Sequence, residues 1–142
     1  GKKNLTVLTN SVEIIIELFG AQDWKVLSTG GESREGSFAL VGYQTDRMLR
    51  SYHVDKAIIS AKGVDMNAGL TDSDDLHANN KRTMLTRAKG RILAIDSSKF
   101  DQVAFAEIGS LDQITTVITD AKPETRWLQH FEKVGVKCIY PK

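Results

Sequence analysis

The sequence has one cysteine, no long apolar run and no surplus of charge of either sign. Because Cys138 is alone, no internal disulfide can form. It lies in the apolar run 136–140, which favours a buried, unreactive thiol over a nucleophile. No apolar run approaches the roughly 20 residues of a membrane-spanning helix, and no signal peptide opens the chain. The sequence therefore predicts a cytoplasmic protein.

The balance of charge restricts the partners of the chain. The formal net charge is +1, from 19 basic and 18 acidic residues that are interspersed. This argues against a large basic face for nucleic acid but leaves room for a small cationic pocket. With 142 residues, 41% hydrophobic and 26% charged, the chain is typical of one globular domain over residues 1–142.

Motifs for catalysis and for metal binding are also missing. The chain has no Walker-type glycine loop and no nucleophile elbow, and its three histidines lack the spacing of metal ligands. We assign no catalytic residue, no metal and no cofactor. Of the histidines, His77 follows a long loop most closely, so it is the one expected to line a site.

Strands and helices alternate along the chain. Apolar runs predict strands at 5–9, 24–29, 54–61, 91–95, 116–119 and 136–140, with extended pieces at 38–41 and 103–108. Helices are expected at 12–19, 44–51, 74–89 and from 120 to 134. A capping box over 71–74 and Gly90 should bound the longest helix, and Asp120 and Gly135 the last. This alternation predicts an α/β fold, a mostly parallel sheet with helices on both faces.

Polar or glycine-rich segments follow four of the predicted strands, at 9–11, 29–32, 61–65 and 96–99. The carboxyl ends of parallel strands share one edge of a sheet, where ligands bind. In the last segment Lys99 stands beside hydroxyls and backbone N–H groups, and Asp96 opens the turn. This chemistry suits a phosphate, although a solvated turn explains the segment as well.

The other segments offer similar choices. Thr9 and Asn10 lead into a helix whose N–H groups and dipole favour an anion, and capping by Asn10 or Ser11 is the alternative. Gly30 and Gly31 allow a close approach of backbone to ligand, or simply a tight turn.

A long loop over 62–71 contains Gly63 and Asp65 and is either a binding loop or a surface excursion. The helix after it carries Lys81, which is a solvated lysine unless that face meets a polar pocket. Asn79 and Asn80 are poor residues for the middle of a helix, and they favour the pocket. The acidic cluster at 72, 74 and 75 suits a helix N-terminus.

These segments, taken in order, resemble the effector-sensing domain of DeoR-family bacterial transcriptional regulators over essentially the whole chain. The segments that carry the resemblance are Thr9-Asn10-Ser11, Gly30-Gly31-Glu32, Asp55-Lys56-Ala57, Gly69-Leu70-Thr71, Lys81-Arg82-Thr83-Met84, Asp96-Ser97-Ser98-Lys99-Phe100 and Val117-Ile118-Thr119-Asp120.

The resemblance implies a Rossmann-like domain related to ribose-5-phosphate isomerase and glucosamine-6-phosphate deaminase. It implies a phosphorylated sugar or related metabolite as effector, and operator DNA bound through an N-terminal winged helix-turn-helix. That part, and the first strand–loop–helix of the sensor with its Asp-x-Gly-x-Thr phosphate loop, are not in this sequence. We also expect a homo-oligomer, because an exposed sheet edge promotes pairing between chains.

The sequence departs from the enzyme relatives where they carry catalytic groups. Their Asp-Gly-Ala-Asp-Glu segment corresponds to residues 62–66, where only Gly63 and Asp65 match. Their catalytic glutamate corresponds to Asn80, an amide without useful basicity. Loss of this base while Lys81 and Lys99 are retained is expected of a binding site derived from an enzyme.

The sequence therefore predicts a non-catalytic sensor. Lys81 and Lys99 contact the anionic part of a sugar phosphate, and Asp65 and Asp96 bind sugar hydroxyls or orient the lysines. The remaining contacts come from Thr9, Asn10, Gly30, Gly31 and Gly63. The alternatives are an aldose–ketose isomerase or deaminase on the same scaffold, and an oligomerisation module with a vestigial pocket.

Overall fold

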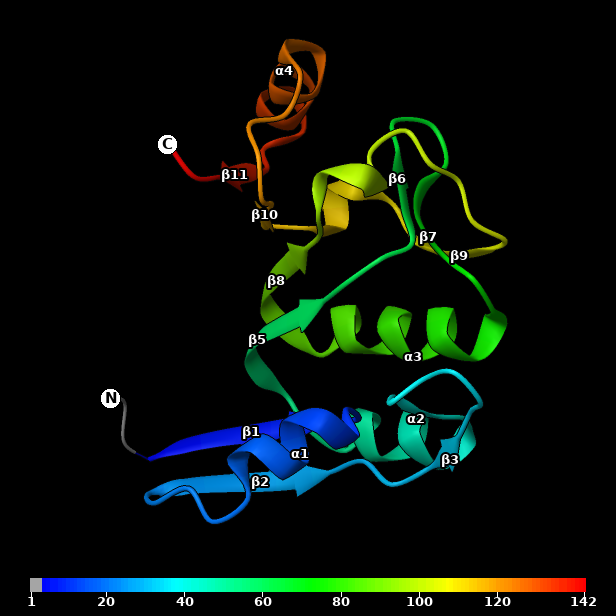
Figure 1. Cartoon of the computed structure of the whole chain (residues 1–142), viewed down its shortest axis with the longest axis vertical. Coiled ribbons are helices and arrows are strands. Elements are labelled where there is room, and N and C mark those ends of the chain that lie inside the picture. Colours follow the sequence, from blue (N-terminus) through cyan, green and yellow to red (C-terminus); the bar gives the residue numbers. More distant parts are fainter. Residues whose placement is uncertain (1–3) are drawn as a thin grey trace. The chain divides into compact units, whose positions relative to one another are not determined.

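The computed structural model describes residues 4–142. The chain divides into two compact units, Gly1–Tyr52 (unit 1) and His53–Lys142 (unit 2). Both contain parallel strands joined through helices, as in a Rossmann-like α/β fold (Figure 1). The fold class expected from the sequence is therefore confirmed.

Unit 1 is built on two parallel strands. β1 (Leu5–Thr9) pairs with β2 (Trp24–Ser28), and α1 (Val12–Leu18) connects them. Ser11 caps α1, because its side chain accepts a hydrogen bond from the backbone N–H of Ile14 at 3.3 Å. A short antiparallel pair, β3 (Glu32–Ser33) and β4 (Leu40–Val41), precedes α2 (Tyr43–Arg50).

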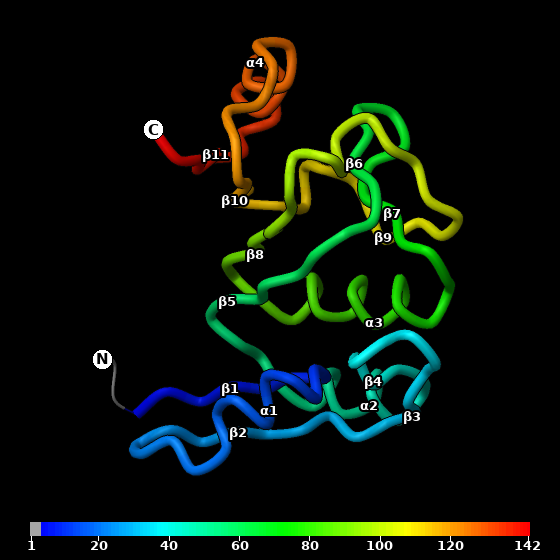
Figure 2. The backbone as a smooth tube through the Cα atoms, in the orientation of Figure 1, coloured from blue at the N-terminus to red at the C-terminus, as the bar shows by residue number. Residues whose placement is uncertain are grey.

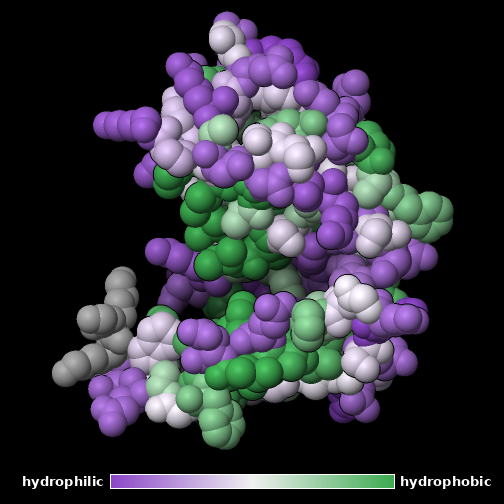
Figure 3. Space-filling view, in the orientation of Figure 1, coloured by the Kyte–Doolittle hydropathy of each residue, from purple (hydrophilic) through white to green (hydrophobic). Residues whose placement is uncertain are grey.

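Apolar side chains remain at the surface of unit 1. Ile16 is 70% exposed and Phe19 is 86% exposed, and Ile14 is also exposed. Hydrophobic side chains gather at the surface over α1 in the space-filling view (Figure 3). The periodicity of this helix therefore gives it an apolar face that its own unit does not bury.

Unit 2 contains a four-stranded parallel sheet in the order β11-β10-β8-β5. Its strands are β5 (Val54–Ile59), β8 (Ala88–Ala94), β10 (Thr116–Ile118) and β11 (Lys137–Ile139). α3 (Asp75–Thr86) lies against β5 and β8, and α4 (Thr125–Val134) lies against β11. Ile59, Leu93 and Val117 point into the core with Trp127 and Phe131 of α4. Burial of this apolar surface is the main force that holds the unit together.

Unit 2 also contains an antiparallel sheet of three strands, two of which lie between β5 and α3 in sequence, where a loop was predicted over 62–71. β6 (Gly63–Asp65) and β7 (Gly69–Asp72) form a hairpin, and β9 (Ala106–Gly109) pairs with β7 (Figure 2). All four residues of β7 are buried. The prediction of an irregular loop over 62–71, either binding or surface-exposed, was wrong, because the glycine that opens each strand of this short buried hairpin looks like a loop glycine.

Several predicted element ends also differ. α3 ends at Thr86, and Gly90 lies inside β8 rather than stopping the helix. The cap of α3 is Asp74, whose side chain accepts from the backbone N–H of His77 at 2.9 Å, so no capping box forms at 71–74. α4 begins after Glu124, and Asp120 does not cap it. Its predicted end is confirmed, because Gly135 has the left-handed φ of 76°.

Candidate functional site

The carboxyl edge of the parallel sheet in unit 2 gathers the polar segments that follow its strands. Ser60 follows β5, residues 96–99 follow β8, and Asp120 lies just beyond β10. The backbone N–H of Ser97 donates to the Asp120 carboxylate at 2.7 Å, which ties two of these segments together. Asp120 therefore helps to shape the edge instead of capping α4.

Lys99 ends a single turn of 3-10 helix, η1 (Ser97–Lys99), on this edge. Asp96 caps the turn and accepts from the Ser98 backbone N–H at 2.9 Å and from the Ser98 hydroxyl. The Lys99 ammonium lies 3.2 Å from the other oxygen of Asp96 and 3.4 Å from Ser98 Oγ. The hydrogen bond from the Ser98 hydroxyl, and then the one from Lys99, lower the pKa of Asp96 to about 2. The carboxylate is thus ionised at neutral pH and holds Lys99 in place.

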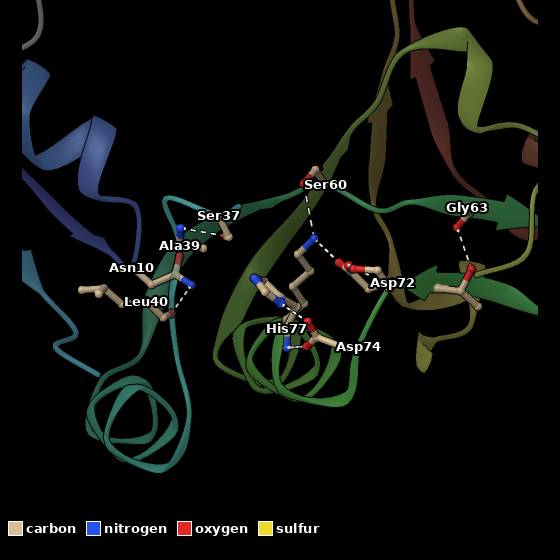
Figure 4. A network of polar contacts seen from close by, with 12 residues as sticks. Asn10, Ser37, Ala39, Leu40, Ser60, Gly63, Asp72, Asp74 and His77 are labelled. Atoms are coloured by element: carbon tan, nitrogen blue, oxygen red, sulfur yellow. Dashed lines mark hydrogen bonds and ion pairs between the residues drawn. The ribbon is translucent and has the colours of Figure 1, made fainter. Parts of the chain in front are cut away.

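Lys81 reaches the same edge from α3. Its ammonium lies 2.5 Å from Asp72 of β7 and 3.3 Å from the hydroxyl of Ser60. Figure 4 shows the dashed lines from Ser60 and Asp72 meeting at one nitrogen. Ile59 of β5 is paired with Leu93 of β8, so Ser60, which Lys81 contacts, and the turn that holds Lys99 follow neighbouring strands. Lys81 is therefore not a solvated surface lysine.

The face of α3 that carries Lys81 also carries His77, four residues earlier. The Nδ1 atom of His77 lies 2.7 Å from the Asp74 carboxylate, and its side chain is largely buried. Asn80, where the resemblance places the glutamate of the enzyme relatives, is only 1% exposed. An amide buried in this way supplies no base.

Gly63 and Asp65 lie in the β6–β7 hairpin. Asp65 accepts from the backbone N–H groups of Asn67 at 2.9 Å and Ala68 at 2.8 Å. These two bonds, that of Ala68 first, lower the pKa of the Asp65 carboxyl. Gly63 is buried, and a Cβ there would overlap the carbonyl oxygen of Gln102. Both residues thus have a role in shaping the turn and its packing.

The Lys99 segment is fastened to the hairpin and to α4 by Asp101. Its backbone N–H donates to the carbonyl of Val64 at 2.7 Å. Its carboxylate accepts from Trp127 Nε1 at 3.2 Å and also pairs with Arg126. This contact was not foreseen in the sequence, because Asp101 and Trp127 are 26 residues apart and form no motif.

The predicted residues of unit 1 also meet at the ends of parallel strands. The backbone N–H of Thr29, after β2, donates to the carbonyl of Thr9, at the end of β1, at 3.1 Å. Asn10 donates from its side chain to the carbonyl of Leu40 at 2.9 Å, so its amide fastens β4 to this strand end. Ser11, not Asn10, caps the helix.

Gly30 and Gly31 form the turn after β2. Both have positive φ, 65° and 118°. The carbonyl of Gly30 accepts from the Thr45 hydroxyl at 2.7 Å, and Gly31 lines a cleft of about 400 Å³ with Glu32, Val41, Tyr43 and Gln44. The two glycines are thus explained by the turn, and Gly31 in addition opens onto a cleft.

Two residues of the edge were missed in the sequence. Asp72 was interpreted as part of an acidic helix N-terminus, but its side chain is 3% exposed and is the partner of Lys81. Ser60 stood at the end of an apolar run without any motif around it. Within residues 4–142, no three His, Cys, Asp or Glu side chains are grouped to hold a metal. In the same part of the chain, no helix has the length and apolar character required to cross a bilayer.

Parallel strands joined by helices, with polar segments at their carboxyl ends, define a Rossmann-like α/β fold. The chain belongs to the DeoR family of transcriptional regulators: the family model of the DeoR C-terminal sensor domain matches residues 1–121.

Curated relatives agree with this family. The chain is 38% identical to the HTH-type transcriptional regulator YulB of Bacillus subtilis over 133 residues, 94% of this chain and 52% of that protein. It is 34% identical to the L-fucose operon activator of Escherichia coli over 84% of this chain and 49% of the relative. The glycerol-3-phosphate regulon repressor of Escherichia coli is 27% identical over 89% of this chain and 50% of its own length. The chain thus spans about half the length of these relatives.

Proposed function

We propose that the chain is the non-catalytic effector-sensing part of a DNA-binding transcriptional regulator, and that its effector is a phosphorylated sugar or a related metabolite. The supporting observation is that the ammonium of Lys81 contacts Ser60 just after β5, and that Lys99 ends the turn after the neighbouring strand β8. Ammonium groups beside hydroxyls suit an anionic ligand. The names of the relatives, which include an L-fucose operon and a glycerol-3-phosphate regulon, support the same class of ligand.

The residues of the carboxyl edge have different proposed roles, either contacting the effector or orienting the lysines. Within residues 4–142, each ammonium meets two acceptors, so one of its three N–H groups is left for a ligand. Asp96 orients Lys99. Contacts of Thr9, Asn10, Gly30, Gly31, Gly63 and Asp65 with the effector remain predictions, to be tested by single alanine or asparagine variants as each site allows.

A sensor is favoured over an isomerase or deaminase because neither Asp65 nor Asn80 is suited to act as the catalytic base. Abstraction of a proton next to a carbonyl needs a base whose pKa lies near the working pH. The pKa of Asp65 is lowered, and Asn80 is a buried amide. The test is a turnover assay with aldose and ketose phosphates. Isomerisation that is abolished by Asp65→Asn would overturn the sensor.

The output of the sensor is a change in operator affinity, through DNA-binding residues outside this chain. The effector shifts the population of assembled states, and a preference of about 1–3 kcal/mol for one state changes operator affinity about 5- to 150-fold. Retardation of operator DNA by the full regulator, with and without phosphorylated sugars, measures this effect. The assembly is proposed to be a homo-oligomer, which sedimentation of the same protein tests.

A further inference from the structure

The two lysines of the carboxyl edge differ in how firmly their charge is matched. The Lys81–Asp72 pair is 2.5 Å long, and the Asp72 side chain is 3% exposed. The Lys99–Asp96 pair is 3.2 Å long, and the Asp96 side chain is 51% exposed. Separating a buried pair leaves an uncompensated buried charge, whereas an exposed pair is weak and exchanges readily. Lys99 can therefore turn to an anion far more cheaply than Lys81.

The surroundings of Asp72 hold it to Lys81. Its Oδ1 accepts from the backbone N–H of Ser73 at 2.7 Å and from the Ser73 hydroxyl at 3.3 Å. Its Oδ2 is left to Lys81. Since both oxygens are engaged and the side chain is buried, the carboxylate cannot swing away when a phosphate approaches. Lys81 and Asp72 thus form a pair with no net charge.

The cluster of Ser60, Lys81 and Asp72 consequently suits a neutral polar group. Ser60 is exposed at the end of β5, and its hydroxyl both donates and accepts. The Lys81 ammonium adds a donor that is fixed in direction by Asp72. One donor and one donor–acceptor side by side match the hydroxyl of a sugar or polyol, which also donates and accepts.

We propose that Ser60 and Lys81 bind a hydroxyl group on the uncharged part of the effector, that Lys99 and not Lys81 is the lysine of this edge that contacts the phosphate, and that Asp72 is a positioning residue for Lys81. This assignment rests on the proposed function and deepens it. It replaces the expectation that both lysines contact the anion. The ligand class is a polyhydroxy phosphate whose hydroxyl reaches β5 while its phosphate lies at η1.

The test compares the binding of inorganic phosphate with that of glycerol 3-phosphate and a panel of phosphorylated pentoses and hexoses, by calorimetry on the intact protein. Ser60→Ala removes one exposed hydroxyl. We expect this variant to bind the best phosphorylated ligand about 2- to 10-fold more weakly and to bind inorganic phosphate with unchanged affinity. Lys99→Met should weaken both kinds of ligand by similar factors, about 10-fold or more.

Asp72→Asn gives the sharpest result, because it removes a negative charge and keeps the shape of the side chain. If Asp72 cancels the charge of Lys81, this variant binds inorganic phosphate several-fold more tightly than the wild type. Weaker or unchanged phosphate binding in a folded Asp72→Asn protein overturns the inference. So does a Ser60→Ala protein that loses as much affinity for inorganic phosphate as for sugar phosphates. If Asp72→Asn does not fold, the Ser60→Ala comparison decides alone.

The two proposals fail in different ways. A wild-type protein that binds no phosphorylated ligand of the panel overturns the proposed function and this inference together. Unchanged affinity in Lys99→Met overturns the phosphate role of Lys99. If the wild-type protein binds ligands of the panel, but Ser60→Ala loses as much affinity for inorganic phosphate as for sugar phosphates, only the division of roles between the two lysines is overturned.

Discussion

Gly31 stands where no other residue fits the backbone. Its φ is 118°, and an added Cβ would overlap Thr45 Oγ1 and lie 2.8 Å from the carbonyl oxygen of Val41. Its neighbour Gly30 has a φ of 65° and open space around the same position. An alanine at position 30 would therefore meet only the cost of a positive φ, whereas an alanine at position 31 would also meet a steric clash.

We expect Gly30→Ala to lower the free energy of unfolding by about 1–2 kcal/mol, the cost of a left-handed conformation. Gly31→Ala should cost a further 1–3 kcal/mol or so from overpacking. Urea unfolding of both variants measures the difference. Equal losses would show that the turn relaxes around the new methyl group.

The Asp96 carboxyl links the Lys99 turn to pH. Its pKa falls from 3.8 to about 2, mainly through the hydrogen bond from the Ser98 hydroxyl. Because the folded carboxyl binds its proton less tightly than the unfolded one, its stabilising contribution is complete above about pH 4. That contribution is lost as the pH falls from there through about 2.

A titration of the Asp96 carboxyl by ¹³C NMR checks this shift. Ser98→Ala should raise the pKa toward its ordinary value, and Lys99→Met should raise it by less, since the Ser98 hydroxyl is the larger cause. A pKa that stays near 2 in Ser98→Ala would contradict this order of causes.

At the scale of elements, Asp101 determines how the Lys99 segment meets α4. Its carboxylate is the acceptor for the indole N–H of Trp127, a residue that is 1% exposed. Asp101→Ala leaves that N–H without its partner and places alanine at a φ of 63°. We expect a loss of about 2–4 kcal/mol, the sum of an unsatisfied buried donor and a left-handed residue.

Chemical denaturation followed by Trp fluorescence is the measurement for Asp101→Ala. Asp101→Asn keeps an acceptor and tolerates the backbone conformation, so it should lose less. Glu124→Gln is the matched control, because the exposed Arg126–Glu124 pair is worth little. A loss in Glu124→Gln as large as that in Asp101→Ala would mean that the ion pairs, not the indole contact, hold the segment.

The strands of unit 2 show which elements can be predicted from local sequence patterns and which cannot. The parallel strands β5, β8, β10 and β11 were predicted because buried strands are continuous apolar runs. The hairpin of β6 and β7 was not, because its strands are short and its burial depends on β9, which lies more than 30 residues further on.

In the candidate site too, features within one segment of sequence were predicted and contacts between distant segments were not. Lys99 and Asp96 were predicted from one contiguous turn after a strand. The partner of Lys81 was not, because Asp72 and Ser60 meet it only when a strand end, a hairpin strand and a helix fold together. Local patterns thus identify chemistry within one turn, whereas contacts across elements need the fold.

For the whole molecule, the division into two units makes ligand binding visible in thermal unfolding. Lys81 and Lys99 both belong to unit 2, His53–Lys142. A ligand that binds only the native state stabilises it by about 2.7 kcal/mol at 100 times its Kd. For a unit of this size, that raises Tm on the order of 10 °C.

We expect a phosphorylated sugar of the right class to raise the Tm of unit 2, and the same sugar without phosphate to have little effect. Calorimetry of the intact protein resolves which transition moves if the two units unfold separately. Lys99→Met should reduce the shift by about half or more at the same ligand concentration, because binding is about 10-fold weaker. It should not lower Tm in the absence of ligand, because the Lys99–Asp96 pair is exposed and weak. A panel in which no phosphorylated sugar moves any transition would favour an oligomerisation module, since every ligand of the native state must stabilise it by mass action.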